Sequence, residues 1–213
     1  MADAIPDHNL FMMCPALNRA ALRPLPAGYH VRNCRPTELE LWKAMPFDDP
    51  ITAAAYQPYM TAYFDRVYAP KGNQFFETCL FVCNAADQPV GTAFIWKAYD
   101  QVQTVHWYKV RQEYEGRGIG RALLAIIMAE LNADDYPVYL HTQPGSYRAI
   151  KLYSDFGFQL LSDPVIGCRQ NELAAALPIL QQQMPPAYFQ QLQITTAPPA
   201  FLQTLALFPD EQF

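Results

Sequence analysis

Long apolar segments are missing from this chain of 213 residues. The longest uninterrupted apolar run, residues 122–129, is far shorter than the roughly 20 residues that a membrane-spanning helix requires. The first ten residues contain no lysine or arginine, so they lack the basic segment that opens a secretory signal peptide. We therefore expect a cytoplasmic protein that has no membrane partner.

Charged side chains are also scarce, at 16% of the residues, and the formal net charge is −5. A protein that binds nucleic acid needs a basic face to neutralise phosphates, so we expect no nucleic-acid partner. Hydrophobic residues make up 51% of the chain, which excludes a disordered protein and suffices for the core of one domain.

The five cysteines form an odd-numbered set at irregular spacings. Cys79 and Cys83 lie four residues apart in a strand-like run, where both side chains face one side. A metal site would need a second pair or nearby histidines, and the sequence offers neither beside them. We expect reduced cysteines in the core and no metal.

The expected elements change in kind along the chain. Residues 1–28, with four prolines, indicate an irregular leader, and residues 29–34 a first strand. Helices follow, and three β-rich runs then predict an antiparallel meander: residues 75–83, 90–98 and 102–110.

The second half of the chain alternates helices with strands, which is typical of an α/β layer. We therefore predict an α/β (α+β) fold with a mixed central sheet, an antiparallel N-terminal meander and flanking helices. The domain is expected to span residues 29–165. Residues 166–213, with a helix at about 171–183, are expected to be an extension packed on the same domain.

A glycine-rich segment follows the last run of the meander. Gly116, Gly118 and Gly120 stand at every second position before a helix, where they let the backbone approach a ligand closely. The helix start supplies N–H groups and the positive end of its dipole, and Arg117 and Arg121 add positive charge. These features predict an anion site suited to a pyrophosphate. Neither the Walker nor the dinucleotide-binding glycine pattern matches the segment.

Two motifs resemble those of the GNAT superfamily of N-acetyltransferases. Residues 115–120 are similar to its acetyl-CoA-binding motif, Gln/Arg-x-x-Gly-x-Gly/Ala, with Glu115 in place of the first residue. A second signature, Asn-x-x-Ala-x-x-Leu/Phe-Tyr followed by Gly-Phe, is matched downstream, with serine in the first position, by Ser146, Ala149, Leu152, Tyr153, Gly157 and Phe158. The two motifs stand in the family's order, about 30 residues apart.

The resemblance implies an enzyme that transfers an acetyl group from acetyl-CoA to a primary amine by direct attack. Tyr153 would act as general acid on the leaving thiolate, because a phenol keeps its proton at neutral pH. A carboxylate at Glu115 is unfavourable beside phosphates unless it points away or pairs with an arginine. Acetyl-CoA, as cosubstrate, would be bound by Tyr108, Val110, Glu115, Gly116, Arg117, Gly118, Ile119, Gly120, Arg121 and Ser146.

The general base stays open between three residues. His106 lies on the strand before the loop, where some members of the family carry a base, although a hydrogen-bonded core histidine is the alternative. Glu113, at the mouth of the loop, is the second candidate, with a solvated turn residue as the alternative. His141, on the next strand, is the third.

The sequence does not identify the acceptor amine. In the family the acceptor pocket is built mainly by the first helices, here residues 42–68, whose aromatic and acidic residues suit a cationic amine but also an ordinary helix core. We expect a small-molecule amine, and a homodimer is one expectation for the assembly. Two other functions stay open, a non-catalytic acyl-CoA-binding regulatory module and a GNAT fold that uses a longer acyl-CoA.

Overall fold

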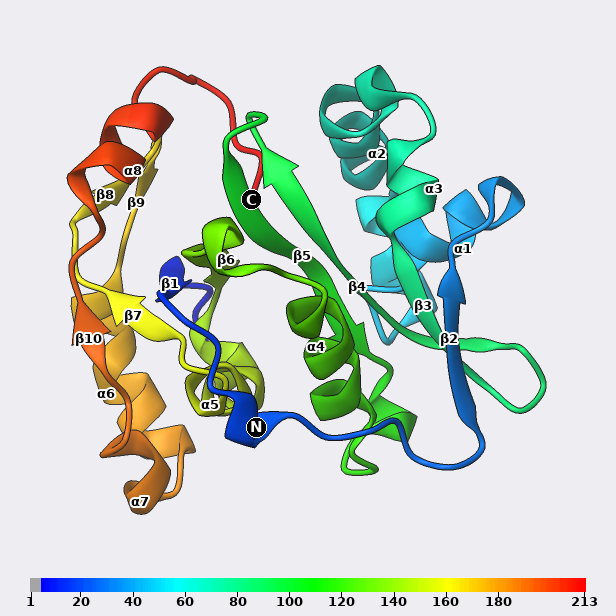
Figure 1. Cartoon of the computed structure of the whole chain (residues 1–213), viewed down its shortest axis with the longest axis horizontal. Coiled ribbons are helices and arrows are strands. Elements are labelled where there is room, and N and C mark those ends of the chain that lie inside the picture. The colour runs from blue at the N-terminus through cyan, green and yellow to red at the C-terminus, as the bar shows by residue number, and fades with distance from the viewer. Residues whose placement is uncertain (1–4) are drawn as a thin grey trace. The chain divides into compact units, whose positions relative to one another are not determined.

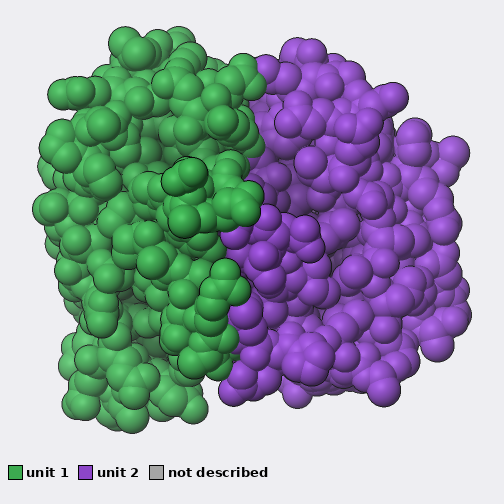
Figure 2. Space-filling model, viewed as in Figure 1, with its two compact units in different colours: residues 1–21, 97–104, 132–213 green, residues 22–96, 105–131 purple. Residues whose placement is uncertain are grey.

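The computed structural model describes residues 5–213, which separate into two compact units (Figure 2). Unit 1 contains residues 5–21, 97–104 and 132–213, and unit 2 contains residues 22–96 and 105–131. No helix in this described part of the chain is long and apolar enough to span a lipid bilayer.

Unit 2 contains the predicted meander, whose strands neighbour one another in the order β5-β4-β3-β2. β2 pairs antiparallel with β3, and β3 pairs antiparallel with β4. Both β4 and β5 continue into unit 1 at the turn that joins them. The elements are β2 (Tyr29–Asn33), α1 (Leu39–Ala44), α2 (Pro50–Val67), α3 (Gln74–Thr78), β3 (Leu80–Asn84), β4 (Pro89–Ala98), β5 (Val102–Val110) and α4 (Ile119–Ala129).

Aromatic side chains from the first helices and from β4 form the core of unit 2. Trp42, Tyr68 and Phe75 are completely buried, and the Phe75 ring centre lies 4.8 Å from that of Trp42 and 5.0 Å from that of Tyr68. Phe75 belongs to α3, so the strand predicted for residues 75–83 is wrong in its first half, and β3 begins only at Leu80. Packing of Phe75 into the aromatic cluster overrides the local strand preference.

Unit 1 contains a strand that the sequence analysis did not predict. Within the stretch expected to be an irregular leader, Leu10–Cys14 forms β1, which lies between β6 (Val138–Thr142) and β7 (Gln159–Leu161) and pairs antiparallel with both (Figure 1). All five residues of β1 are buried. A strand covered on both faces reads as a continuous apolar run without alternation, so it gives no periodic signal.

The C-terminal segment belongs to unit 1 as well. β10 pairs parallel with β7, which pairs antiparallel with β1, so the sheet that contains these strands is mixed, as predicted. Within unit 1, β8 and β9 form a separate two-stranded sheet. The Phe201 ring stacks on Tyr139 with ring centres 3.7 Å apart, and Phe201 and Leu205 join the buried core around Phe11. The remaining elements are α5 (Tyr147–Asp155), β8 (Val165–Ile166), β9 (Arg169–Gln170), α6 (Leu173–Gln183), α7 (Pro186–Phe189), β10 (Ile194–Thr195) and α8 (Pro199–Leu205).

Candidate functional site

The glycine-rich loop joins β5 to α4, as the sequence predicts, although α4 begins at Ile119, so that Gly120 lies in its first turn rather than before it. Gly116 and Gly118 adopt φ values of 74° and 81°. This left-handed region costs a residue with a side chain about 1–3 kcal/mol. Gly118 is also the N-cap of α4, so no side chain of the cap residue competes for the N–H groups of the first helical turn.

The start of α4 packs closely on the end of β5. A Cβ atom at Gly120 would overlap the Tyr108 hydroxyl and would come within 3.6 Å of a Val110 methyl group. Burial raises the pKa of the Tyr108 phenol above its ordinary value, whereas the nearby Arg121 acts to lower that pKa. Because Gly120, the third glycine of the motif, has no Cβ atom, the first turn of α4 can contact the end of β5 this closely.

The charged side chains of the loop nearly offset one another. Arg117 is exposed, donates a hydrogen bond from Nη2 to the Glu113 carbonyl oxygen at 2.9 Å, and lies over the Tyr114 ring. Glu113 and Glu115 are exposed too. Three arginines (Arg111, Arg117 and Arg121) and two glutamates leave the loop and the first turn of α4 with little net charge, so an anion would depend mainly on the backbone N–H groups and the helix dipole.

One of the acidic residues of the predicted acceptor region, Asp48, instead holds the end of β5. Asp48 accepts a hydrogen bond from Lys109 Nζ at 2.5 Å and another from the backbone N–H of Gln112 at 3.0 Å. These partners lie 61 and 64 residues away in the chain, so no local pattern reveals the contact. Asp48 ties the strand end and the start of the loop to the segment before α2.

His106 lies in the aromatic core of unit 2. Its side chain is only 3% exposed, and its ring packs near those of Tyr68 and Phe94. His106 Nδ1 lies 2.5 Å from the Tyr68 hydroxyl oxygen, which also accepts a hydrogen bond from Trp107 Nε1 at 2.9 Å. Trp107 has a φ of 48°, which interrupts the regular strand at this point. Tyr68 and Trp107 are therefore linked to His106 in one hydrogen-bonded group. No local pattern predicts the contact with Tyr68, because Tyr68 lies 38 residues before His106, at the end of α2.

The residues of the second motif lie in unit 1. Tyr153 is on α5 and is 6% exposed, with its ring centre 5.8 Å from that of Phe158. Ser146 is the N-cap of α5, but within the described residues its hydroxyl makes no capping hydrogen bond. Gly157 follows the helix with a φ of 101°. The glycine of the motif thus occupies a conformation that other residues rarely adopt.

Comparison with protein families gives a match to the Acetyltransferase (GNAT) family over residues 40–158. The chain belongs to this family. A search of curated proteins gives no match.

Solved structures resemble this GNAT chain in fold. A protein from Drosophila has 17% identity and a TM-score of 0.50 over 73% of this chain and 48% of its own. An acetyltransferase of the GNAT family from Colwellia psychrerythraea has 13% identity and a TM-score of 0.50, covering 74% and 54%. A tandem GNAT protein from the clavulanic acid biosynthesis pathway has 12% identity and a TM-score of 0.51, covering 71% and 50%. The chain spans about half the length of these proteins, and identities this low show the fold alone.

His141, the third base candidate in this GNAT chain, lies on β6 in unit 1. Its Nε2 is 3.0 Å from Asn9 Oδ1, and its ring packs on Phe11. Burial lowers the pKa of His141 to about 3, and the positive charge of Arg169 acts in the same direction. His141 is therefore neutral at neutral pH and accepts a proton poorly, which weakens it as a general base.

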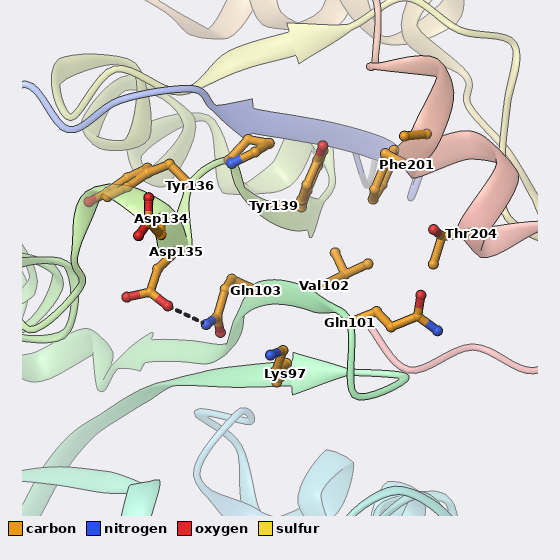
Figure 3. A pocket seen from close by; sticks show the side chains of 12 residues that line it. Lys97, Gln101, Val102, Gln103, Asp134, Asp135, Tyr136, Tyr139, Phe201 and Thr204 are labelled. Atoms are coloured by element: carbon orange, nitrogen blue, oxygen red, sulfur yellow. Dashed lines mark hydrogen bonds between the residues drawn. The ribbon is translucent and has the colours of Figure 1, made fainter.

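Unit 1 of the GNAT chain also contains a cavity of about 250 Å³ (Figure 3). Beside it, Gln103 Nε2 donates a hydrogen bond to Asp135 Oδ1 at 3.0 Å. The described residues that line it include none of the predicted site residues. They are Lys97, Gln101, Val102, Gln103, Asp134, Asp135, Tyr136, Pro137, Tyr139, Ala200, Phe201 and Thr204.

Proposed function

We propose that this GNAT chain transfers an acetyl group from acetyl-CoA to the primary amine of a small molecule. The observation that carries the proposal is the loop of residues 115–120, in which two left-handed glycines lead into α4 without a capping side chain. The 11 residues of α4 supply a helix dipole and first-turn N–H groups at that point, which together favour a phosphate.

The residues of the loop fit acetyl-CoA. Backbone N–H groups of residues 116–120 would bind the pyrophosphate, with Arg117 and Arg121 offsetting Glu113 and Glu115. The backbone of Tyr108 and neighbouring β5 residues would pair with the amides of the pantetheine arm. Acetyl-CoA supplies an activated thioester, whose carbonyl the amine attacks.

Two side chains are proposed to move protons. Tyr153 would donate its phenol proton to the leaving thiolate. His106 would take the proton of the amine. The Tyr68 hydroxyl oxygen has two lone pairs, so it can accept from His106 Nδ1 as well as from Trp107, and this tautomer leaves a lone pair on His106 Nε2.

Calorimetric titration with acetyl-CoA tests the loop. We expect saturable binding by the unaltered chain and a roughly tenfold or greater loss of affinity in Gly118→Trp, because the indole would fill the loop. Gly72→Trp is the matched control, since Gly72 also has a positive φ and open surroundings but lies elsewhere in unit 2. Equal affinities of the two variants, or no binding at millimolar acetyl-CoA by the unaltered chain, would overturn the proposal.

Turnover of a panel of amines tests the general acid. Tyr153→Phe preserves the buried ring and is expected to lower kcat by about 10²–10⁴-fold while its affinity for acetyl-CoA stays unchanged. Tyr147→Phe, on the same helix, should keep full activity. Unchanged kcat in Tyr153→Phe would remove this tyrosine from the mechanism.

Two competing functions give different results in the same assays. A non-catalytic acyl-CoA-binding regulatory module would bind acetyl-CoA but turn over no amine. A GNAT enzyme for longer acyl-CoA would prefer long-chain donors to acetyl-CoA. Cationic acceptors are included in the panel because Tyr56 and Tyr59 are half-exposed on α2, although the nearby Asp48 and Asp49 are engaged by backbone N–H groups.

A further inference from the structure

Strand pairing at the outer strand of unit 2 brings together three side chains that can bind a metal. His30 of β2 lies directly opposite Cys83 of β3, so their side chains share one face of the sheet. Asp87, in the β3–β4 hairpin, reaches the same point. One ligand atom from each residue (a ring nitrogen, the thiol sulfur and a carboxylate oxygen) lies within 4.8 Å of the others. We propose that His30, Cys83 and Asp87 form a zinc site outside the acetyl-CoA loop.

The three atoms lie at most roughly 1 Å beyond the spacing that tetrahedral zinc requires. Bonds of about 2.0–2.3 Å to sulfur, nitrogen and oxygen place the ligand atoms roughly 3.3–3.7 Å apart. His30 Nε2 is already 3.0 Å from Asp87 Oδ1. Small side-chain rotations would therefore complete the site. Zinc binds a mixed thiolate, imidazole and carboxylate set readily, and water can serve as fourth ligand.

The hairpin holds its ligands in place. Asp87 has a φ of 58°, and its backbone N–H donates to the Asn84 carbonyl oxygen at 3.0 Å. The register of β3 against β4 shifts between Val82 and Cys83, one residue before β3 ends at Asn84. Cys83 is buried, whereas the side chains of His30 and Asp87 are 49% and 42% exposed. A metal would therefore enter from the side of His30 and Asp87.

Nearby charges both compete with the metal and support it. Asp87 accepts hydrogen bonds from Arg32 Nε at 2.7 Å and Arg35 Nη2 at 3.0 Å. Arg32 is also paired through both terminal nitrogens with Glu38 at 2.8 Å, so much of its charge is offset. With Arg35 on the other carboxylate oxygen, Asp87 keeps an outer partner of the kind that orients metal ligands.

Binding replaces the thiol proton of Cys83, which is released to solvent as the zinc–sulfur bond forms. Burial raises the pKa of this thiol to about 11, although Arg32 acts to lower it. Affinity should therefore rise with pH, because the proton competes with the metal.

Titration of the full chain with Co²⁺, followed by displacement with Zn²⁺, tests the site. We expect one equivalent of Co²⁺ to produce thiolate-to-cobalt charge-transfer absorption, which Zn²⁺ removes. Cys83→Ser should abolish this absorption. His30→Gln, at an exposed position, should weaken Co²⁺ binding by more than the roughly 10–100-fold that loss of an outer partner costs.

Matched controls separate this site from adventitious binding. Cys168→Ser and His8→Gln alter an exposed cysteine and a histidine elsewhere in the chain, and both should keep the absorption. Circular dichroism checks that each variant is folded. If Cys83→Ser does not fold, His30→Gln alone tests the site. The proposal would be overturned by the absence of charge-transfer absorption in the unaltered chain at millimolar Co²⁺. It would equally be overturned if the absorption persists in folded Cys83→Ser, or if His30→Gln binds Co²⁺ with unchanged affinity.

Discussion

Replacing Gly157 with alanine is expected to destabilise unit 1 strongly. At a φ of 101°, a Cβ atom would stand 2.7 Å from the Ala16 carbonyl oxygen and 3.6 Å from the Asn18 backbone nitrogen. That backbone cannot swing aside, because Asn18 donates hydrogen bonds to the carbonyl oxygens of Phe156 at 3.0 Å and Asp155 at 2.8 Å. The segment after β1 is thus seated on the end of α5 where only glycine fits.

The expected cost has two sources. A left-handed backbone costs alanine about 1–3 kcal/mol. The overlap with the Ala16 carbonyl adds about 1–3 kcal/mol. Urea denaturation should therefore show a loss of about 2–6 kcal/mol for Gly157→Ala.

Gly145→Ala is the matched control in the same unit. No atom lies within 4 Å of a Cβ built at this position, and its φ is not in the left-handed region. Its stability should stay within about 0.5 kcal/mol of the unaltered chain. If Gly157→Ala is equally well tolerated, the close approach of the Ala16 carbonyl does not exist in solution.

Two other expectations concern unit 1. Burial lowers the pKa of His141 from 6.5 to about 3 in the folded protein. As the pH falls below 6.5, the unfolded chain takes up a proton at His141 before the folded protein does, so the free energy of unfolding decreases. Between pH 7 and 5 this costs about 2 kcal/mol, and denaturation of His141→Gln should lack that loss while His8→Gln keeps it. An identical pH profile for His141→Gln would refute the assignment. Phe201→Ala removes the ring stacked on Tyr139 and should cost about 3–5 kcal/mol, whereas Leu207→Ala, at a position 74% exposed, should change stability by less than about 0.5 kcal/mol. Equal effects of these two variants would show that α8 does not dock as described.

The parts of the fold that the sequence predicts well depend on local patterns. β5 occupies residues 102–110 as expected because its β-rich run is bounded by turns. The loop can be located from the sequence because its glycines recur at every second position, and Gly116 and Gly118 adopt positive φ values that favour glycine. Helix α6 begins at Leu173 and ends at Gln183, close to the expected 171–183.

Long-range contacts decide the features that could not be predicted. The hydrogen bond between His106 and Tyr68 joins residues 38 apart, so the sequence reveals a histidine but not its partner. Likewise, His30 and Cys83 become neighbours only through the pairing of β2 with β3. Residues with reactive side chains are therefore easier to predict from the sequence than their contact partners, because tertiary packing determines those partners.

The place of β1 in the sheet bears on the order in which a growing chain can fold. β1 leaves the ribosome well before β6 and β7, which carry Thr142, the partner of Leu10, and Leu160, the partner of Met12. Both segments of unit 2, residues 22–96 and 105–131, emerge in between, so its meander can form before β1 has strands to pair with. During that interval the five apolar residues of β1 are unpaired and exposed, and such a segment can bind a chaperone or aggregate with another chain.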